Sequence, residues 1–347
     1  MQKAPERCYA IFAEGRLQDD NAKTAHGLLR YGKDEVVAIV DSTLAGKRVL
    51  DVMPDLRRDA PIVGTVEEAL EYDPTSMLVG LAPAGGRLPQ EWMDSLREAA
   101  DAGLEVVSGL HQRLAPEFPE AKIWDVREPP EDFPLFSGEG FDVEPKVALT
   151  VGTNAAVGKM TATLEVQLAA EEAGVSTEFA ATGQTGIIIA GWGISVDAVV
   201  SDFVAGAAEQ LVLQAAKSSP DLILVEGQGS LGHPAYSGVT LSLLHGSCPD
   251  CLILCADASE EKIMGLTPRP EPARAIRLYE EVAALVKPSP VVAITVNTKG
   301  LEDEEAETFV SKVSDETGLP AVDPFRGSVA PILEAILATS KTRATGS

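Results

Sequence analysis

The sequence reads Gly-Thr-Asn-Ala-Ala-Val-Gly-Lys-Met-Thr at residues 152–161. Residues 146–151 before it are mostly apolar and typical of a buried strand, and residues 160–173 after it are typical of a helix that ends at Gly174. This order of strand, glycine-bounded loop and helix predicts a phosphate-binding loop, because backbone N–H groups and the positive end of the helix face the anion. Lys159 adds a positive charge. We therefore expect the chain to bind a phosphorylated ligand.

This loop differs from the common P-loop in two ways. Five residues separate Gly152 from Gly158, where the common loop has four. Met160 stands where a Ser or Thr normally holds Mg²⁺, and Thr161 comes one position late. The longer spacing resembles the loop of dethiobiotin synthetase and its relatives. Because a thioether does not bind a hard cation, we expect phosphate binding here without a resident metal.

Composition limits the class of protein. The chain has 347 residues, of which 45% are hydrophobic and 23% charged, as in globular proteins of two domains. Its net charge of −25 disfavours nucleic acid and anionic membranes as partners. The chain begins without a basic and apolar leader, and its four cysteines are not spaced for a zinc site. We therefore predict a reduced, cytoplasmic protein that acts on small molecules, and we expect it to form a homo-oligomer.

Two domains are predicted, both of the α/β class. Proline, glycine and acidic residues crowd at 128–140 without periodicity, which favours a boundary near residue 140. Residues 1–140 alternate between strand and helix patterns, which predicts a Rossmann-like parallel sheet whose later part resembles the CoA-binding domain of succinyl-CoA synthetase. Residues 141–347 predict a P-loop NTPase-like parallel sheet of the dethiobiotin-synthetase kind. The expected strands are residues 8–13, 36–40, 61–63, 76–81, 104–107, 147–151, 177–182, 222–225, 251–255 and 291–296.

Polar residues follow several of these strands. Ligands of parallel α/β sheets bind outside the carboxyl ends of the strands, so these residues are candidates for a site. Glu226 follows the third strand of the second domain, in the position of a metal-binding or base carboxylate, with the alternative of only supporting the phosphate loop. Asp197 is a second carboxylate, with the alternative of capping a helix. Asn297 ends the fifth strand, where related P-loop proteins recognise a base through an amide.

Six segments taken together resemble one family, which includes the DgcN-type D-glutamate N-acetyltransferases. They are residues 23–30, 152–161, 182–186, 197–209, 226–237 and 244–246. The family combines an N-terminal Rossmann-like domain with a C-terminal P-loop domain. The resemblance implies transfer of acetyl from acetyl-CoA to the amino group of D-glutamate, in D-glutamate catabolism. CoA carries phosphates that such a loop binds without Mg²⁺, which is compatible with Met160.

This activity assigns candidate roles. Acetyl transfer needs a base for the substrate ammonium and donors for the oxyanion. The catalytic candidates are Glu226, His233 and Asp197, with Glu226 or His233 as the base and the N–H groups of residues 227–229 as oxyanion donors. Arg269 is a candidate clamp for a dicarboxylate. The cofactor-binding candidates are Gly152, Thr153, Asn154, Gly158, Lys159, Thr161 and Asn297. The substrate-binding candidates are Gln184, Thr185, Gly186, Tyr236 and Arg269.

Two alternatives stay open from the sequence. One is an ATP-dependent enzyme of the dethiobiotin-synthetase type, which activates a carboxylate or carbamate by phosphorylation. In that enzyme Glu226 and Asp197 hold Mg²⁺ of Mg-ATP, and Thr161 substitutes for the missing ligand. The other is a nucleotide-binding regulatory protein without turnover.

Overall fold

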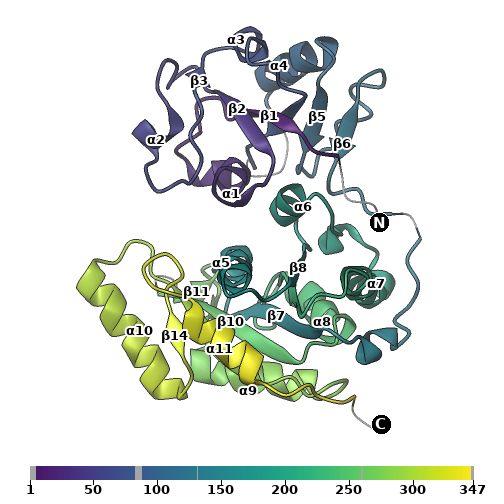
Figure 1. The fold of residues 1–347 in the computed structure, drawn as a ribbon, viewed down its shortest axis with the longest axis vertical. Helices are drawn as coiled ribbons and strands as arrows, with labels where there is room; N and C mark the ends of the chain where they lie inside the picture. The colour runs from purple at the N-terminus through teal and green to yellow at the C-terminus, as the bar shows by residue number, and fades with distance from the viewer. Residues whose placement is uncertain (1–4, 83–87, 131, 259–260, 345–347) are drawn as a thin grey trace. The chain divides into compact units, whose positions relative to one another are not determined.

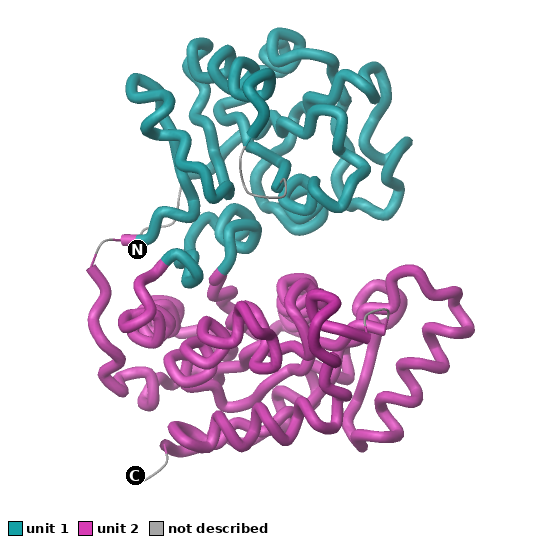
Figure 2. The backbone as a smooth tube through the Cα atoms, turned by 180° about the vertical axis from the view of Figure 1, so that it is seen from behind, with its two compact units in different colours: residues 1–129, 183–198 teal, residues 130–182, 199–347 magenta. Residues whose placement is uncertain are grey.

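The computed structural model describes residues 5–82, 88–130, 132–258 and 261–344. The chain forms two compact units. Unit 1 consists of Met1–Pro129 with Gly183–Ala198, and unit 2 of Pro130–Thr182 with Val199–Ser347, drawn teal and magenta in Figure 2. Within the described residues, no helix has the length and apolar character needed to cross a membrane.

Unit 1 contains a six-stranded parallel sheet with the strand order β3-β2-β1-β4-β5-β6. This order is that of the Rossmann fold, which confirms the prediction. The strands are β1 (Cys8–Phe12), β2 (Glu35–Val40), β3 (Ile62–Val63), β4 (Ser76–Val79), β5 (Glu105–Ser108) and β6 (Ile123–Asp125). The helices are α1 (Lys23–Tyr31), α2 (Val49–Val52), α3 (Val66–Leu70), α4 (Gln90–Asp101) and α6 (Gln184–Ala190).

The core of unit 1 lies where α3 and α4 cover the sheet. Leu96 of α4 and Met77 of β4 are fully buried in one apolar cluster with Phe12 of β1. Apolar side chains recur on one face of α4, so burying that face against the sheet is what holds the helix there. Figure 1 shows both helices beside the strands of this sheet.

Unit 2 contains a second six-stranded parallel sheet, with the order β14-β13-β10-β7-β9-β8. Its strands are β7 (Lys146–Gly152), β8 (Thr177–Ala180), β9 (Leu222–Val225), β10 (Cys251–Asp257), β13 (Val291–Asn297) and β14 (Ala321–Val322). Its helices are α5 (Lys159–Glu172), α7 (Val204–Ala216), α8 (Ser237–Gly246), α9 (Pro272–Ala283), α10 (Asp303–Thr317) and α11 (Ala330–Ala338). Among the described residues, the strands β11 (Lys262–Ile263) and β12 (Thr267–Pro268) pair only with each other, as a separate antiparallel hairpin.

The core of unit 2 joins α5 and α11 to the sheet (Figure 1). Val166 of α5 and Ile336 of α11 are fully buried against Ile253 of β10. The strands β9 and β10 near the sheet's centre are buried along their whole length, as expected for a parallel sheet that is covered on both faces. The P-loop domain expected from the sequence is confirmed.

The segment Gly183–Ala198 follows β8 in the chain but belongs to unit 1. Its helix α6 packs against α1, where the hydroxyls of Thr24 and Thr185 lie 3.2 Å apart. A Cβ on Gly109 would lie 2.8 Å from the Cγ of Gln184, so α6 also packs closely on the chain that follows β5. The substrate-binding candidates of α6 are therefore held by the Rossmann-like unit.

Candidate functional site

The loop between β7 and α5 has the form of a phosphate cradle. Its backbone turns through the left-handed region at Ala156 (φ 57°) and Gly158 (φ 93°). The Lys159 ammonium bends back and donates to the carbonyl oxygen of Asn154 at 2.9 Å. A Cβ on Gly152 would lie 2.9 Å from both of those groups, so glycine is needed where β7 ends.

Two polar side chains of this loop are buried. Lys159 is only 7% exposed, and burial lowers the pKa of its ammonium to about 8, with Cys255 and Glu226 acting in the opposite direction. Thr153 is fully buried, and among the described residues its hydroxyl has no hydrogen-bond partner. A buried hydroxyl without a partner costs about 1–3 kcal/mol. A phosphate oxygen in the loop is the kind of group that would satisfy both side chains.

The first turn of α5 completes the cradle. The leading N–H groups of any helix have no partner inside the helix, and they point toward its positive end. Met160 and Thr161 both lie in this turn and are half-buried. The sequence prediction that the loop presents positive charge and donors to an anion fits this geometry.

Glu226 lies at the end of β9, beside the phosphate loop. It is 4% exposed, and its carboxylate accepts the backbone N–H of Thr182 at 3.0 Å. A Cβ on Gly227 would lie 1.7 Å from the carbonyl oxygen of Thr150, so the backbones of β9 and β7 approach closely here. This approach brings the carboxylate near enough to Lys159 to act on its pKa.

One expected oxyanion donor is already in use. The N–H of Gly227 donates to the hydroxyl of Thr150 at 2.9 Å. The expectation that this group stabilises an oxyanion is therefore wrong, because the glycine packs and bonds against the neighbouring strand. The same expectation for the N–H groups of Gln228 and Gly229 stays a prediction.

His233 and Tyr236 lie further along the loop between β9 and α8. His233 is 3% exposed, and burial together with the charge of Lys159 lowers the pKa of its imidazole. Tyr236 is 52% exposed, and its ring stacks on that of His233 with the centroids 4.4 Å apart. Lys159 therefore acts on the pKa of His233, and Glu226 acts on the pKa of Lys159.

Tyr279 of α9 joins the two loops. This residue is 1% exposed; its hydroxyl donates to the carbonyl oxygen of Gly152 at 2.8 Å and accepts the N–H of Leu231 at 3.1 Å. Burial raises the pKa of the phenol to about 12, so the hydroxyl keeps its proton and its donated bond. This role was not predicted, because a single tyrosine on an amphipathic helix gives no sequence signal of it.

Arg269 and Asn297 lie at the same edge of the sheet and contact Asp257 at the end of β10. Arg269 donates to the carbonyl oxygen of Asp257. The amide nitrogen of Asn297 donates to the carboxylate of Asp257 at 3.1 Å, and its amide oxygen accepts the N–H of Lys299 at 3.1 Å. The clamp expected of Arg269 and the base recognition expected of Asn297 stay predictions.

The remaining candidates belong to unit 1. Gln184, Thr185 and Gly186 form the first turn of α6, and Asp197 lies in a short 3₁₀ helix (Val196–Ala198). Arg127 connects the two, because it donates to the side-chain oxygen of Gln184 at 3.0 Å and to the carboxylate of Asp197 at 2.6 Å. Arg127 was not predicted as a site residue, since it lies in an expected loop region without a motif.

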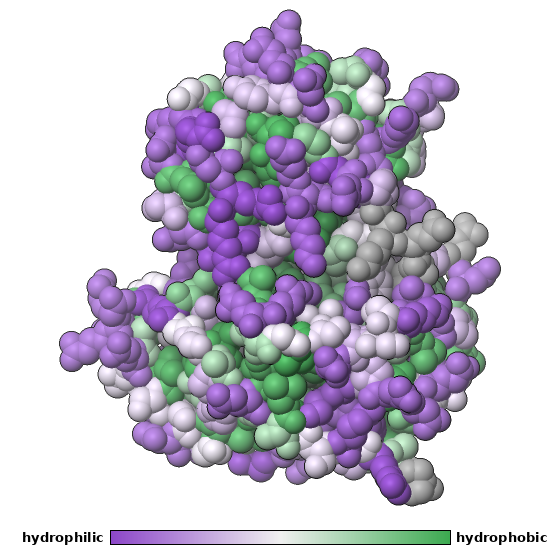
Figure 3. All heavy atoms as spheres, viewed as in Figure 1, coloured by the Kyte–Doolittle hydropathy of each residue, from purple (hydrophilic) through white to green (hydrophobic). Residues whose placement is uncertain are grey.

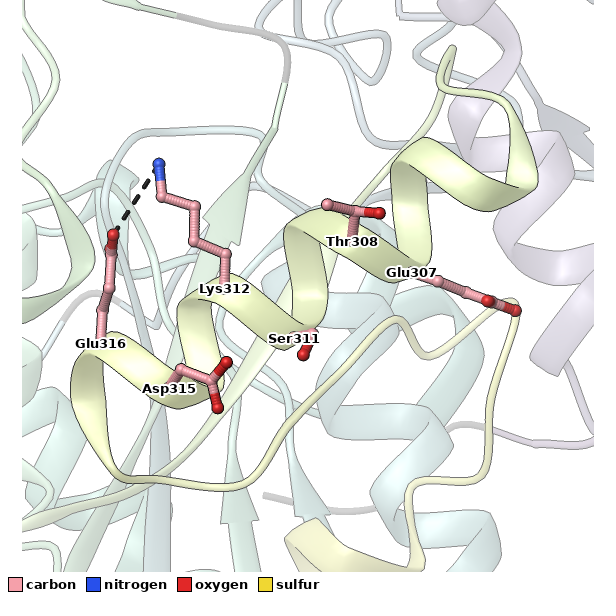
Figure 4. A pocket seen from close by; sticks show the side chains of 6 residues that line it. All are labelled: Glu307, Thr308, Ser311, Lys312, Asp315 and Glu316. Atoms are coloured by element: carbon pink, nitrogen blue, oxygen red, sulfur yellow. Dashed lines mark ion pairs between the residues drawn. The ribbon is translucent and has the colours of Figure 1, made fainter.

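Two surface hollows of unit 2 lie away from these residues. One, of about 530 Å³, lies along α10, where Figure 4 shows Lys312 reaching toward Glu316. The other, of about 790 Å³, lies between α10 and the segment from β14 to Ser328. Neither is lined by a candidate residue. The molecular face drawn in Figure 3 is mainly hydrophilic, with apolar side chains in small groups, in keeping with the acidic composition.

Comparison with known proteins identifies the family. A Rossmann-like domain of unknown function, DUF1611_N, matches residues 42–129, and the P-loop domain of unknown function DUF1611_C matches residues 134–333. A crystal structure of a DUF1611 family protein from Anabaena variabilis is 38% identical, with a TM-score of 0.89, and the match covers 96% of this chain and 99% of that one.

Two curated relatives carry the name D-glutamate N-acetyltransferase. The protein from a Pseudoalteromonas species is 38% identical over 278 residues, which are 77% of this chain and 82% of the relative. The protein from Tritonibacter scottomollicae is 38% identical over 286 residues, which are 79% of this chain and 84% of the relative. The resemblance found in the sequence is confirmed: the chain belongs to the DUF1611 family, with its N-terminal Rossmann-like and C-terminal P-loop domains.

Proposed function

We propose that this protein transfers an acetyl group from acetyl-CoA to the amino group of D-glutamate, as a step in D-glutamate breakdown. The phosphate loop is the observation that carries the proposal. It buries Lys159 and an unpartnered Thr153 hydroxyl in an anion cradle, while Met160 stands where a nucleotide enzyme has its magnesium ligand. Relatives at 38% identity that carry the name D-glutamate N-acetyltransferase support the choice of acetyl as the transferred group and of D-glutamate as its acceptor.

CoA suits a cradle of this kind. It brings a pyrophosphate and a 3′-phosphate, which bind through backbone N–H groups and a lysine without a metal. Lys159, Thr153 and the first turn of α5 are the groups of this chain that would contact those phosphates. The thioester supplies an activated acetyl group, so no phosphorylation step is required.

Glu226 is the base in this proposal. The substrate ammonium gives up a proton to its carboxylate, and the amine nitrogen then attacks the carbonyl carbon of the thioester. The new C–N bond forms as the carbonyl electron pair moves to oxygen, and that pair returns when the C–S bond breaks. The nitrogen loses two protons overall; one leaves on the CoA thiol and the other goes to solvent. Arg269 is the proposed partner for a substrate carboxylate.

The test is incubation of the pure protein with acetyl-CoA and D-glutamate, with L-glutamate and no amino acid as controls. We expect free thiol and N-acetyl-D-glutamate in equal amounts, and the same rate in EDTA, because Met160 supplies no magnesium ligand. A parallel incubation with ATP, Mg²⁺ and D-glutamate follows phosphate. Release of phosphate with no release of thiol would overturn the proposal in favour of the ATP-dependent alternative.

A further inference from the structure

The imidazole of His233 is held in one orientation by its own loop. Its Nδ1 accepts the backbone N–H groups of Ala235 and Tyr236, both at 3.1 Å. The Tyr236 ring stacks on one face of the imidazole, with 23° between the planes. The residue is also almost completely buried. These contacts leave the ring little freedom to turn.

The same contacts decide which nitrogen carries the proton. A backbone N–H can only donate, so Nδ1 has to present its lone pair to both N–H groups. In the neutral ring the proton is therefore on Nε2. Burial and the positive charge of Lys159 lower the pKa of His233, which keeps the ring neutral at pH 7.

A neutral ring in this tautomer is a poor base. Nε2 has no lone pair to accept a proton, and the lone pair of Nδ1 is occupied by Ala235 and Tyr236. Protonation at Nδ1 would break both of those bonds. What remains is the Nε2–H group, a donor with a fixed direction on the loop that Tyr279 joins to Gly152 at the end of β7.

We propose that His233 acts as a fixed hydrogen-bond donor, through Nε2–H, to the carbonyl oxygen that becomes negative during acyl transfer. This role rests on the proposed function. It supplies a donor in place of the N–H of Gly227, which is bonded to Thr150. The donor does not move its proton: it stabilises the electron pair on oxygen while the C–N bond forms, until the C–S bond breaks.

Two variants separate this role from one in which the ring only holds the loop before α8. His233→Asn places a carbonyl oxygen where Nδ1 was, so it keeps an acceptor for the two N–H groups and removes the donor. His233→Gln places an amide N–H near the position of Nε2 and removes the acceptor. We expect His233→Asn to melt at the wild-type temperature and to bind acetyl-CoA normally, but to lose roughly 10²- to 10³-fold in kcat. We expect His233→Gln to retain more of kcat than His233→Asn.

Two results would overturn the inference. Wild-type kcat in His233→Asn would mean that the ring only holds the loop before α8. The donor role would also be refuted if the wild-type protein acetylates D-glutamate and His233→Gln is less active than a well-folded His233→Asn. If the wild-type protein shows no acetylation at all, the proposed function fails instead, so the two failures are distinct.

The tautomer itself is measured without turnover. The chain has four histidines, so ¹⁵N spectra of histidine-labelled protein can be assigned by comparison with His233→Asn. We expect the His233 signals of an Nε2-protonated neutral ring at pH 7, and a titration midpoint below the ordinary histidine pKa. A proton on Nδ1, or a ring that titrates near the ordinary histidine pKa, would contradict the inference.

Discussion

The two units have the same kind of sheet but use its carboxyl edge differently. In unit 1 the acidic side chains at that edge are satisfied by their own backbone. Asp41, which follows β2 and is fully buried, accepts the N–H groups of Leu17 and Thr43 and the hydroxyl of Thr43. Asp125, at the end of β6, accepts the backbone N–H groups of Leu114 and Ala115.

At the corresponding edge of unit 2, Glu226 is also bonded to the backbone, but the phosphate loop buries a hydroxyl that, in the described part of the chain, is not. Lys159 is buried with its pKa lowered to about 8, and the Thr153 hydroxyl has no partner among the described residues. Burying groups in this way costs stability unless a ligand compensates for it. At the carboxyl edge of a parallel sheet, buried polar groups that all have partners in the protein indicate a structural turn. Buried polar groups that have none indicate a ligand site.

The largest expected effect is that of Glu226→Gln. The change keeps the shape of the side chain and its acceptor for the Thr182 N–H but removes the charge that takes the substrate proton. We expect kcat to fall by about 10²- to 10⁴-fold, as for loss of a general base, with acetyl-CoA affinity nearly unchanged. Steady-state kinetics and calorimetry measure the two quantities. Wild-type kcat in the folded variant would move the base elsewhere, with Asp197 as the next candidate.

Lys159→Ala should weaken binding of CoA by more than tenfold. The change removes a charge-assisted contact to phosphate that is worth about 1.5–3 kcal/mol. The affinity of the wild-type protein should also depend on pH. Because the phosphate attracts only the protonated lysine, whose pKa is about 8, affinity is full below pH 8 and falls above it by up to about tenfold per pH unit.

Calorimetry at several pH values checks both statements. The control is the variant itself, since Lys159→Ala removes the titrating group and should flatten the pH dependence. Equal CoA affinity in wild type and variant would exclude this loop as the phosphate site.

Sequence patterns predicted the fold well where apolar runs are continuous. The strand expected at residues 222–225 is β9, whose four residues are all buried. The edge strand β14 was not predicted, because its two residues are only half-buried and too few to show a period. The sequence also gives no sign that Gly183–Ala198 packs with unit 1, since that depends on contacts between α6 and α1, far apart in the chain.

The candidate site also has parts that the sequence predicts and parts that it does not. The phosphate loop could be predicted because glycine spacing and a lysine follow directly from the geometry of the loop. The roles of Tyr279 and Arg127 could not, because each acts through hydrogen bonds between segments that are distant in sequence. The state of His233 needed the structure for the same reason: its tautomer depends on where two backbone N–H groups point.

A smaller effect is expected at Arg127, which holds the candidate residues of unit 1. Arg127→Ala removes the bonds to Gln184 and Asp197, so α6 should open more easily. The Arg127 side chain is 11% exposed, and we expect the loss of about one charged hydrogen bond to raise hydrogen exchange in α6 by about tenfold. The control is Arg113→Ala, whose ion pair with Glu128 is exposed and should contribute little. Equal exchange in both variants would contradict a positioning role for Arg127.

The smallest effect on activity is expected at the closed edge of unit 1. Asp41→Asn is the counterpart of Glu226→Gln, since both replace a buried carboxylate by its amide. The new amide would turn a donor toward groups that themselves donate, so we expect the free energy of unfolding to fall by about 1–3 kcal/mol. Because Asp41 bonds to Leu17 and Thr43, neither of them a candidate site residue, kcat should not change. Urea denaturation measures the free energy of unfolding, and steady-state kinetics measure kcat. A folded Asp41→Asn protein with a large loss of kcat would show that the edge of unit 1 takes part in the chemistry, and the contrast between the two sheet edges would no longer hold.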